Sequence, residues 1–182
     1  MRRIVAVVGM SGAGKSEVAR VLEDSGFVRV RFGDLTDEVL RERGLPFTEE
    51  NERRVREELR RRHGMAAYAE LNLPRIEEAL ERSHVVIDGL YSWEEYKLLK
   101  GRYGEGLLVL AVYSSPRTRR ERLGRRAERP LSPDEVLSRD WSEIENLNKG
   151  GPIAMADFTL VNEGSLEELR GGVRRLAGGL LR

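Results

Sequence analysis

A glycine-rich stretch near the start of the chain has the residue types and spacing of a phosphate-binding loop. Residues 9–16 read GMSGAGKS, which fits the pattern G-x-x-x-x-G-K-[ST] at every position. The stretch follows an apolar run and precedes an amphipathic one, the strand–loop–helix context in which this motif binds phosphates. We therefore expect it to hold a nucleoside triphosphate. The expected nucleotide-binding residues here are Gly9, Met10, Ser11, Gly12, Ala13, Gly14, Lys15, Ser16 and the adjoining Glu17.

Each residue type in this loop has a distinct chemical task. Glycines let successive backbone N–H groups turn towards the phosphates, and the positive end of the following helix faces the same anion. The ammonium of Lys15 is expected to reach the β- and γ-phosphates and to offset the charge that develops during transfer. The hydroxyl of Ser16 offers a neutral oxygen to Mg²⁺, which keeps water and phosphate as its other ligands. The loop predicts the phosphate donor and leaves the acceptor open.

Two aspartates follow predicted strands. Asp88, within VVIDG at 85–89, ends an apolar run beside the phosphate loop, so its carboxylate is a candidate ligand for a Mg²⁺-bound water. Asp34, within FGD at 32–34, ends another run where an acceptor would enter, and it would accept a hydroxyl proton or bind the acceptor. Simpler roles stay open for both, namely a turn residue for Asp88 and a helix cap for Asp34.

An arginine-rich segment follows the fourth apolar run. It contains Arg117, Arg119, Arg120, Arg122, Arg125, Arg126 and Arg129. At least half of these are expected to form a solvated helix face. Arg122 and Arg126 are four residues apart, so they would share a helix face, and guanidinium groups suit stacking on a base and bidentate contact with phosphate. We predict that this pair belongs to a lid that excludes water from the triphosphate, with Arg139 as a third candidate.

The elements that must position these residues form an α/β pattern, because short β-branched runs alternate with longer charged, amphipathic stretches. The runs are continuously apolar, as in parallel strands buried on both faces. Strands are expected at about 3–8, 27–31, 84–87, 107–113 and 158–161. Helices are expected at about 15–24, 35–43, 49–62, 65–82, 93–100, 116–126, 133–146 and 166–177. We predict a three-layer α/β/α fold of the P-loop type with a five-stranded parallel sheet.

Length and composition narrow the possible classes. The 182 residues suit a single domain, residues 1–182. Lys+Arg 32 against Asp+Glu 31 gives a net charge of +1, so no general basic field indicates nucleic acid or an anionic membrane as a partner. The absence of cysteine excludes disulfides and thiolate zinc sites. No segment approaches the roughly 20 apolar residues of a membrane helix, and the first apolar run is too short for a signal peptide. We expect a soluble cytoplasmic protein, either a monomer or a homodimer.

Other P-loop classes fit less well than a small kinase. The tetrapeptide NKGG at 148–151 is superficially similar to the guanine-reading N-K-x-D, but Gly151 replaces the required carboxylate and no apolar strand precedes it. Oligomeric motor ATPases need a second helical domain, for which this chain has little room. A small kinase therefore remains the best interpretation.

With these residues in place, the chain resembles the nucleoside monophosphate kinase and dephospho-CoA kinase branch of P-loop proteins, and most closely an archaeal-type adenylate kinase-related group. The phosphate loop is the most specific part of the resemblance, while the stretches at 32–34, 87–89, 115–126 and 156–165 are similar to corresponding parts of that family. The resemblance implies transfer of the γ-phosphate of Mg-ATP to a nucleotide-like small molecule. It also implies that Asn162 and Gly164 lie beside adenine, that about 33–82 is a helical acceptor-binding insertion, and that about 115–150 is the lid.

The resemblance departs on the acceptor side. The family often has an arginine after Gly-Asp and within Asp-Gly-x-Arg-Ser, whereas this chain has Leu35-Thr36-Asp37 and Leu90-Tyr91-Ser92 at those places. Tyr91 would stack on a base, bond to a sugar or simply pack. The acceptor therefore stays open between a nucleoside monophosphate, dephospho-CoA and a non-nucleotide alcohol. A nucleotide-binding sensor without an acceptor is the alternative outside kinases.

Overall fold

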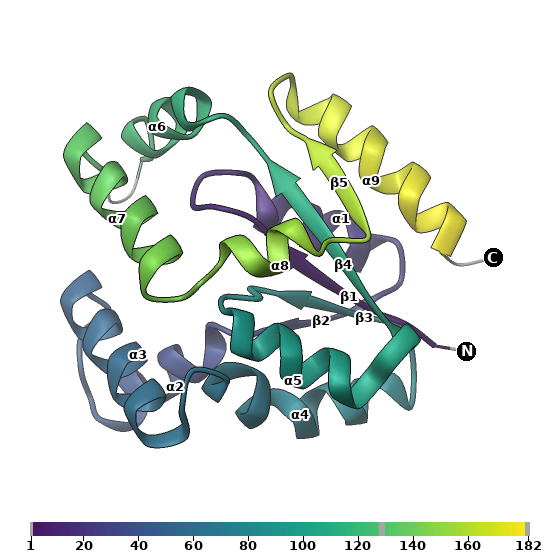
Figure 1. The fold of residues 1–182 in the computed structure, drawn as a ribbon, viewed down its shortest axis with the longest axis horizontal. Helices are drawn as coiled ribbons and strands as arrows, with labels where there is room; N and C mark the ends of the chain where they lie inside the picture. Colours follow the sequence, from purple (N-terminus) through teal and green to yellow (C-terminus); the bar gives the residue numbers. More distant parts are fainter. Residues whose placement is uncertain (1, 128–129, 181–182) are drawn as a thin grey trace.

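The computed structural model describes residues 2–127 and 130–180 and contains a five-stranded sheet in the order β2-β3-β1-β4-β5 (Figure 1). Every neighbouring pair is parallel. The strands are β1 (Ile4–Val8), β2 (Val28–Arg31), β3 (Val85–Asp88), β4 (Leu107–Tyr113) and β5 (Phe158–Val161). The predicted strands, the parallel sheet and the α/β fold class are confirmed.

Two apolar clusters fill the space between the sheet and the helices on its two faces. One joins Val5, Val7 and Leu110 to helices α1 and α9, and the other joins Ala6 and Ile87 to helices α4 and α5. Alternate residues of β1 thus enter opposite clusters, as expected for a strand buried on both faces. The helices are α1 (Lys15–Asp24), α2 (Asp34–Glu42), α3 (Glu49–His63), α4 (Ala67–Leu80), α5 (Trp93–Tyr103), α6 (Pro116–Gly124), α7 (Pro133–Glu145), α8 (Gly150–Ala154) and α9 (Leu166–Leu180), with a 3₁₀ turn, η1, at Gly104–Gly106.

The helix starts follow local capping chemistry. Ser92 and Ser132 each accept a hydrogen bond from the backbone of the third residue of their helix, Glu95 and Glu135, whose carboxylates bond back to the capping serine's N–H group. These reciprocal bonds satisfy backbone groups that a helix N-terminus otherwise leaves unpaired. Helix α8 was not predicted, because its Gly-Gly-Pro beginning is typical of a loop rather than of a helix.

Helix α6 ends earlier than the sequence suggested. Its last residue is Gly124, and Arg125 follows as the C-terminal cap. Glycine is a weak helix former, so the helix stops there instead of continuing to Arg126. The prediction that Arg122 and Arg126 share one helix face is therefore wrong.

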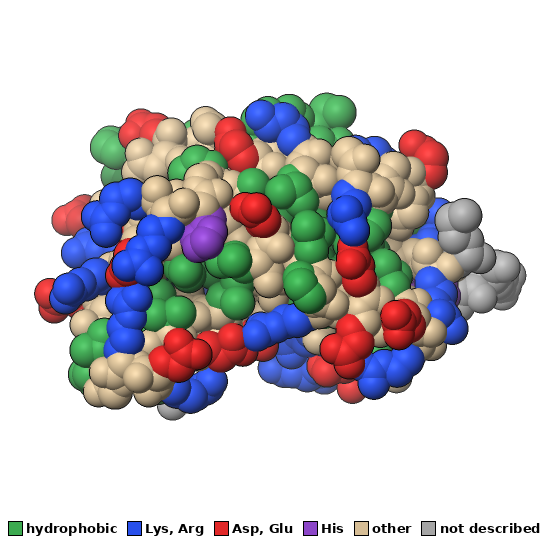
Figure 2. Space-filling view, turned by 90° about the horizontal axis from the view of Figure 1, so that it is seen from below, with side chains coloured by type: hydrophobic (Ala, Val, Ile, Leu, Met, Phe, Trp, Pro, Cys, Tyr) green, Lys and Arg blue, Asp and Glu red, His purple; other side chains and the backbone are tan. Residues whose placement is uncertain are grey.

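The surface carries charges of both signs. Figure 2 shows Lys and Arg side chains next to Asp and Glu side chains over much of the face seen from below Figure 1. This intermixing on the face fits a net charge of +1. Among the residues that the structure describes, no helix combines the length and apolarity required to span a bilayer.

Candidate functional site

The loop between β1 and α1 has a backbone that requires glycine at specific points. Gly9 has a φ of 151°, and a Cβ there would lie 2.4 Å from the carbonyl oxygen of Val112. Gly14, which caps α1, has a φ of 102°, and a Cβ there would lie 2.5 Å from Nδ2 of Asn162. Both contacts are closer than a side chain tolerates, and both φ values favour glycine. The glycines of the motif thus allow the loop to pack tightly against β4 and the end of β5.

Lys15 begins α1 and turns back over the loop. Its Nζ donates a hydrogen bond to the carbonyl oxygen of Met10 at 3.0 Å. The pKa of Lys15 is lowered to about 7, first by burial and then by the charge of Lys149, while the charges of Glu143 and Asp88 act in the opposite direction. Lys15 therefore lies in a cluster of charges contributed by α7, β3 and the start of α8.

Glu143, near the end of α7, lies directly on the phosphate loop. Its carboxylate accepts hydrogen bonds from the backbone N–H of Ser11 at 3.2 Å and from the Ser11 hydroxyl at 2.6 Å. Nζ of Lys149 lies 2.9 Å from the same carboxylate. Burial alone would raise the pKa of Glu143, but the charges of Lys149 and Lys15 outweigh it and hold that pKa at about 2. Glu143 is therefore an anion held by the loop and a buried lysine.

A second buried ion pair holds α7 against α6. The guanidinium of Arg119 donates to the two carboxylate oxygens of Asp140 at 2.6 and 2.8 Å, and both side chains are buried. Arg119 also donates to the carbonyl oxygens of Ser11 and Ser114, both at 3.2 Å. One side chain thus connects α6, α7, the phosphate loop and the end of β4.

Sequence reasoning assigned no role to Glu143, Lys149 or Asp140, and counted Arg119 among mostly solvated arginines. A signal for α7 was present in the spacing of Val136, Asp140 and Glu143, which lie four and three residues apart and therefore face the same side of a helix. All three are buried. Lys149 was noted only within the tetrapeptide NKGG, which indicated no role for it, and it lies at the N-terminal cap of the short helix α8.

The structure brings Arg122 and Asn162 together beside the loop. Arg122 donates to the Ser114 hydroxyl at 2.9 Å and to Oδ1 of Asn162 at 3.3 Å. Nδ2 of Asn162 in turn donates to the carbonyl oxygen of Ala13 at 2.8 Å. Gly164 follows in the connection from β5 to α9. A polar chain thus runs from α6 through the end of β5 to the phosphate loop.

Arg139, on α7, lies close to both Glu143 and Arg126. Burial lowers the pKa of Arg126, and the charge of Arg139 lowers it further, so the two guanidinium groups are near each other. Nε of Arg139 is 3.7 Å from a carboxylate oxygen of Glu143. Arg139 therefore approaches Glu143, whereas Arg122 contacts Ser114 and Asn162.

Asp88 and Ser16 were predicted as the metal-binding residues. Asp88 ends β3 opposite Val7 of β1, is buried, and forms an ion pair with Arg29. Ser16 lies exposed in the first turn of α1. Within the described residues, no group of three or more His, Cys, Asp or Glu side chains is arranged to hold a metal. One hydroxyl and one carboxylate nevertheless fit Mg²⁺, because this ion keeps several waters and takes further oxygens from bound phosphates.

Asp34 is the first residue of α2 and does not cap it. The N-terminal cap is Gly33, and Asp34 instead accepts a hydrogen bond from Arg31 at 2.8 Å, while the same guanidinium donates to Asp37 at 2.9 Å. The interpretation of Asp34 as a helix cap is therefore wrong. Its half-exposed carboxylate lies beside β2, at the beginning of the helical insertion formed by α2, α3 and α4.

Two other residues have clear packing or pairing partners. Glu17 forms ion pairs with Arg20 at 2.7 Å and with Arg170 of α9 at 2.6 Å, so its carboxylate joins α1 to α9. The ring of Tyr91 meets the ring of Tyr68 edge to face, with 5.7 Å between the two centroids. Nζ of Lys149 lies 5.7 Å from the centroid of the Tyr91 ring. Burial raises the pKa of Tyr91. The packing role considered for Tyr91 is thus confirmed.

Glu95, on α5, has a fully buried carboxyl group that contacts the backbone of Tyr91. One oxygen accepts hydrogen bonds from the backbone N–H groups of Tyr91 and Ser92 at 2.7 and 3.2 Å, while the other has no hydrogen-bond partner among the described residues. Burial raises the pKa of Glu95 to about 7, although these N–H groups and the charges of Arg60 on α3 and Lys149 at α8 act to lower it. The folded protein therefore favours the neutral form of Glu95.

This raised pKa predicts a stability that depends on pH. Between pH of about 4.5 and 7 the unfolded chain loses the Glu95 proton while the folded protein keeps it, so the free energy of unfolding falls as pH rises. Glu95→Gln keeps a neutral side chain that also suits the helix cap. At pH 8 we expect the variant to be more stable than the wild type by about 3 kcal/mol, with little difference at pH 5. Urea unfolding at both pH values measures this, and an unchanged difference between them would contradict it.

Comparison with known proteins shows the family of the chain. A family model described as an AAA domain matches residues 5–156. A UPF0200 protein of Thermococcus kodakarensis is 40% identical over 177 residues, and the match covers 95% of each chain. The chain belongs to the UPF0200 family.

Solved structures share the fold of this UPF0200 member at low sequence identity. Shikimate kinase from Bacteroides thetaiotaomicron superposes with a TM-score of 0.63 at 16% identity, and the match covers 99% of both chains. A gluconokinase from Sinorhizobium meliloti superposes with a TM-score of 0.58 at 20% identity, covering 100% of this chain and 98% of the other. The P-loop kinase fold is therefore confirmed, while the narrower resemblance to nucleoside monophosphate and dephospho-CoA kinases stays a prediction.

Proposed function

We propose that the protein is an ATP-dependent phosphotransferase that moves the γ-phosphate of Mg-ATP to a small acceptor. The observation that carries this proposal is the loop at residues 9–16, which joins β1 to α1 and has Lys15 folded over it. Such a loop offers backbone N–H groups, a helix N-terminus and an ammonium to one polyphosphate. The similarity to the kinase fold supports the same class of reaction.

Donor binding follows from the residues around the loop. Lys15 and the loop N–H groups would hold the β- and γ-phosphates, and Arg122 with Asn162 and Gly164 would line the nucleoside side. Ser16 and Asp88 would hold Mg²⁺, which when bound neutralises charge on the phosphates. Arg126 and Arg139 would contact the phosphoryl group during transfer. In such sites the protein acts mainly by positioning and by offsetting charge.

We propose that the helical insertion from α2 to α4 binds the acceptor. We also propose that the segment containing α6 and α7 closes over the site. Asp34 would orient the acceptor hydroxyl or phosphate. Helix α3 ends in Arg60, Arg61, Arg62 and His63. Arg60 lies over the Tyr68 ring, and Arg62 pairs with Glu58. The exposed Arg61 supports an acceptor that carries negative charge. We propose a nucleotide-type acceptor, such as a nucleoside monophosphate or dephospho-CoA.

Incubation with Mg-ATP and separate acceptors tests this function. The panel contains nucleoside monophosphates, dephospho-CoA, shikimate, gluconate and a simple alcohol, and mass spectrometry detects the addition of one phosphoryl group. We expect one nucleotide-type acceptor to gain phosphate at the expense of ATP. Tight binding of ATP with transfer to no acceptor would contradict the proposal and favour a nucleotide-binding sensor.

A further inference from the structure

The phosphate loop already holds an anion that belongs to the chain itself. Ser11 offers its backbone N–H and its hydroxyl to the carboxylate of Glu143. A carboxylate and a phosphate oxygen are acceptors of the same kind for such donors. The position of the Glu143 carboxylate thus marks a point on the loop where a negatively charged group is stabilised.

Lys149 is arranged around the same point. Its side chain is 2% exposed, its Nζ lies 2.9 Å from Glu143, and its backbone N–H donates to the carbonyl oxygen of Glu143 at 3.1 Å. A buried ammonium needs an anionic partner, because an unpaired buried charge is costly. Arg139 approaches the carboxylate from the adjacent turn of α7. Two cations and the loop donors of Ser11 therefore surround one carboxylate.

We propose that Ser11, Lys149 and Arg139 form the subsite for the γ-phosphoryl group of ATP, and that the Glu143 carboxylate occupies this subsite until ATP displaces it. This inference rests on the proposed function for the identity of the ligand. A γ-phosphate and a Glu143 carboxylate would repel each other at the same donors. ATP binding therefore requires Glu143 to leave, whereas ADP, which lacks the γ-phosphate, does not compete with it.

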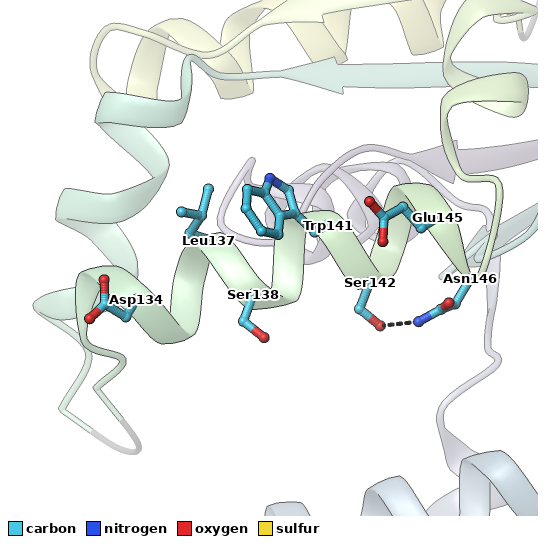
Figure 3. Close-up of a pocket in the computed structure, with 7 residues that line it drawn as sticks. All are labelled: Asp134, Leu137, Ser138, Trp141, Ser142, Glu145 and Asn146. Atoms are coloured by element: carbon cyan, nitrogen blue, oxygen red, sulfur yellow. Dashed lines mark hydrogen bonds between the residues drawn. The ribbon is translucent and has the colours of Figure 1, made fainter.

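The contacts of α7 would keep the helix attached while the Glu143 side chain leaves the loop. Asp140, one turn earlier, is held by Arg119 on α6. Figure 3 shows Leu137 and Trp141 extending from one side of α7 and Ser138, Ser142 and Asn146 from another, along a surface pocket. Trp141 is 58% exposed. This pocket lies on the face of α7 away from Glu143. The Arg119–Asp140 pair fixes the preceding turn, so the departure of Glu143 requires a change in its side chain alone.

Binding of ATP and ADP to Glu143→Gln tests the subsite. Glutamine keeps the size of the side chain and removes the competing charge. By isothermal titration calorimetry we expect the variant to bind ATP about tenfold more tightly than the wild type does and ADP within about twofold. Lys149→Met should weaken ATP binding at least about tenfold and leave ADP binding within about twofold. Glu145→Gln, an exposed carboxylate on the same helix, is the matched control and should change neither affinity.

The ratio of ATP to ADP affinity decides the result. Equal shifts for both nucleotides in Glu143→Gln, or no shift for either, would overturn the inference. If Glu143→Gln does not fold, Lys149→Met provides the second measurement. A loss of affinity for ATP alone supports the subsite, and equal losses for ATP and ADP would overturn the inference. A wild type that binds both nucleotides but phosphorylates no acceptor would refute the proposed function alone.

Discussion

Replacing Lys15 with methionine is expected to reduce phosphate transfer by about 10³-fold or more and to leave the protein folded. The ammonium is the cation that the loop itself places on the β- and γ-phosphates, so its loss removes charge stabilisation where negative charge develops. Methionine retains the length and apolar stem of the side chain. Because burial already lowers the pKa of Lys15 to about 7, an uncharged replacement is tolerated in the folded protein. Initial rates with Mg-ATP and the acceptor found in the panel measure the effect.

The matched control is Lys97→Met, since Lys97 is exposed on α5 and belongs to no part of the proposed site. This variant should transfer phosphate at the wild-type rate. Circular dichroism and thermal unfolding establish that both variants are folded. Wild-type activity in Lys15→Met would refute the role of the loop, and with it the proposed phosphotransfer.

Replacing Arg119 with leucine is expected to produce the largest loss of stability, about 3–5 kcal/mol in the free energy of unfolding. The substitution leaves the carboxylate of Asp140 buried without its bidentate partner. It also removes the hydrogen bonds to the backbone of Ser11 and Ser114, which tie α6 to the loop and to β4. Chemical denaturation of the variant and the wild type measures the difference.

Arg120→Leu provides the comparison, because Arg120 is the next residue of α6 and is exposed. It should change the free energy of unfolding by less than about 0.5 kcal/mol. The double variant Arg119→Leu/Asp140→Leu removes both buried charges and should recover part of the lost stability. Equal stabilities for Arg119→Leu and Arg120→Leu would show that the buried pair does not hold α6 and α7 together.

The fold was predictable because its signals are local. Residues 4–8, 85–87 and 107–112 are apolar throughout, and such runs are typical of strands in a sheet that is covered on both faces. The phosphate loop was equally predictable, since its motif occupies the consecutive residues 9–16. The strand runs and the loop motif are both patterns of adjacent residues, which the sequence displays directly.

The buried charges around the loop were not predictable in the same way. Arg119 and Asp140 are 21 positions apart, and nothing in either local sequence indicates that they meet. Glu143 and Lys149 are close in sequence, but a charged helix such as α7 is normally solvated, so their burial depends on how α7 docks. Helix α6 ends at Gly124, so Arg126 lies beyond the helix on which its spacing from Arg122 had placed it.

The position of β1 has a consequence for the growing chain on the ribosome. Although β1 is synthesised first, its two neighbours in the sheet begin only at Val85 and Leu107. Until β3 and β4 have emerged, the apolar run Ile4–Val8 has no partner strand and depends on other means of protection from aggregation. The phosphate loop, although encoded near the N-terminus, can therefore acquire its shape only after well over half of the protein has been translated.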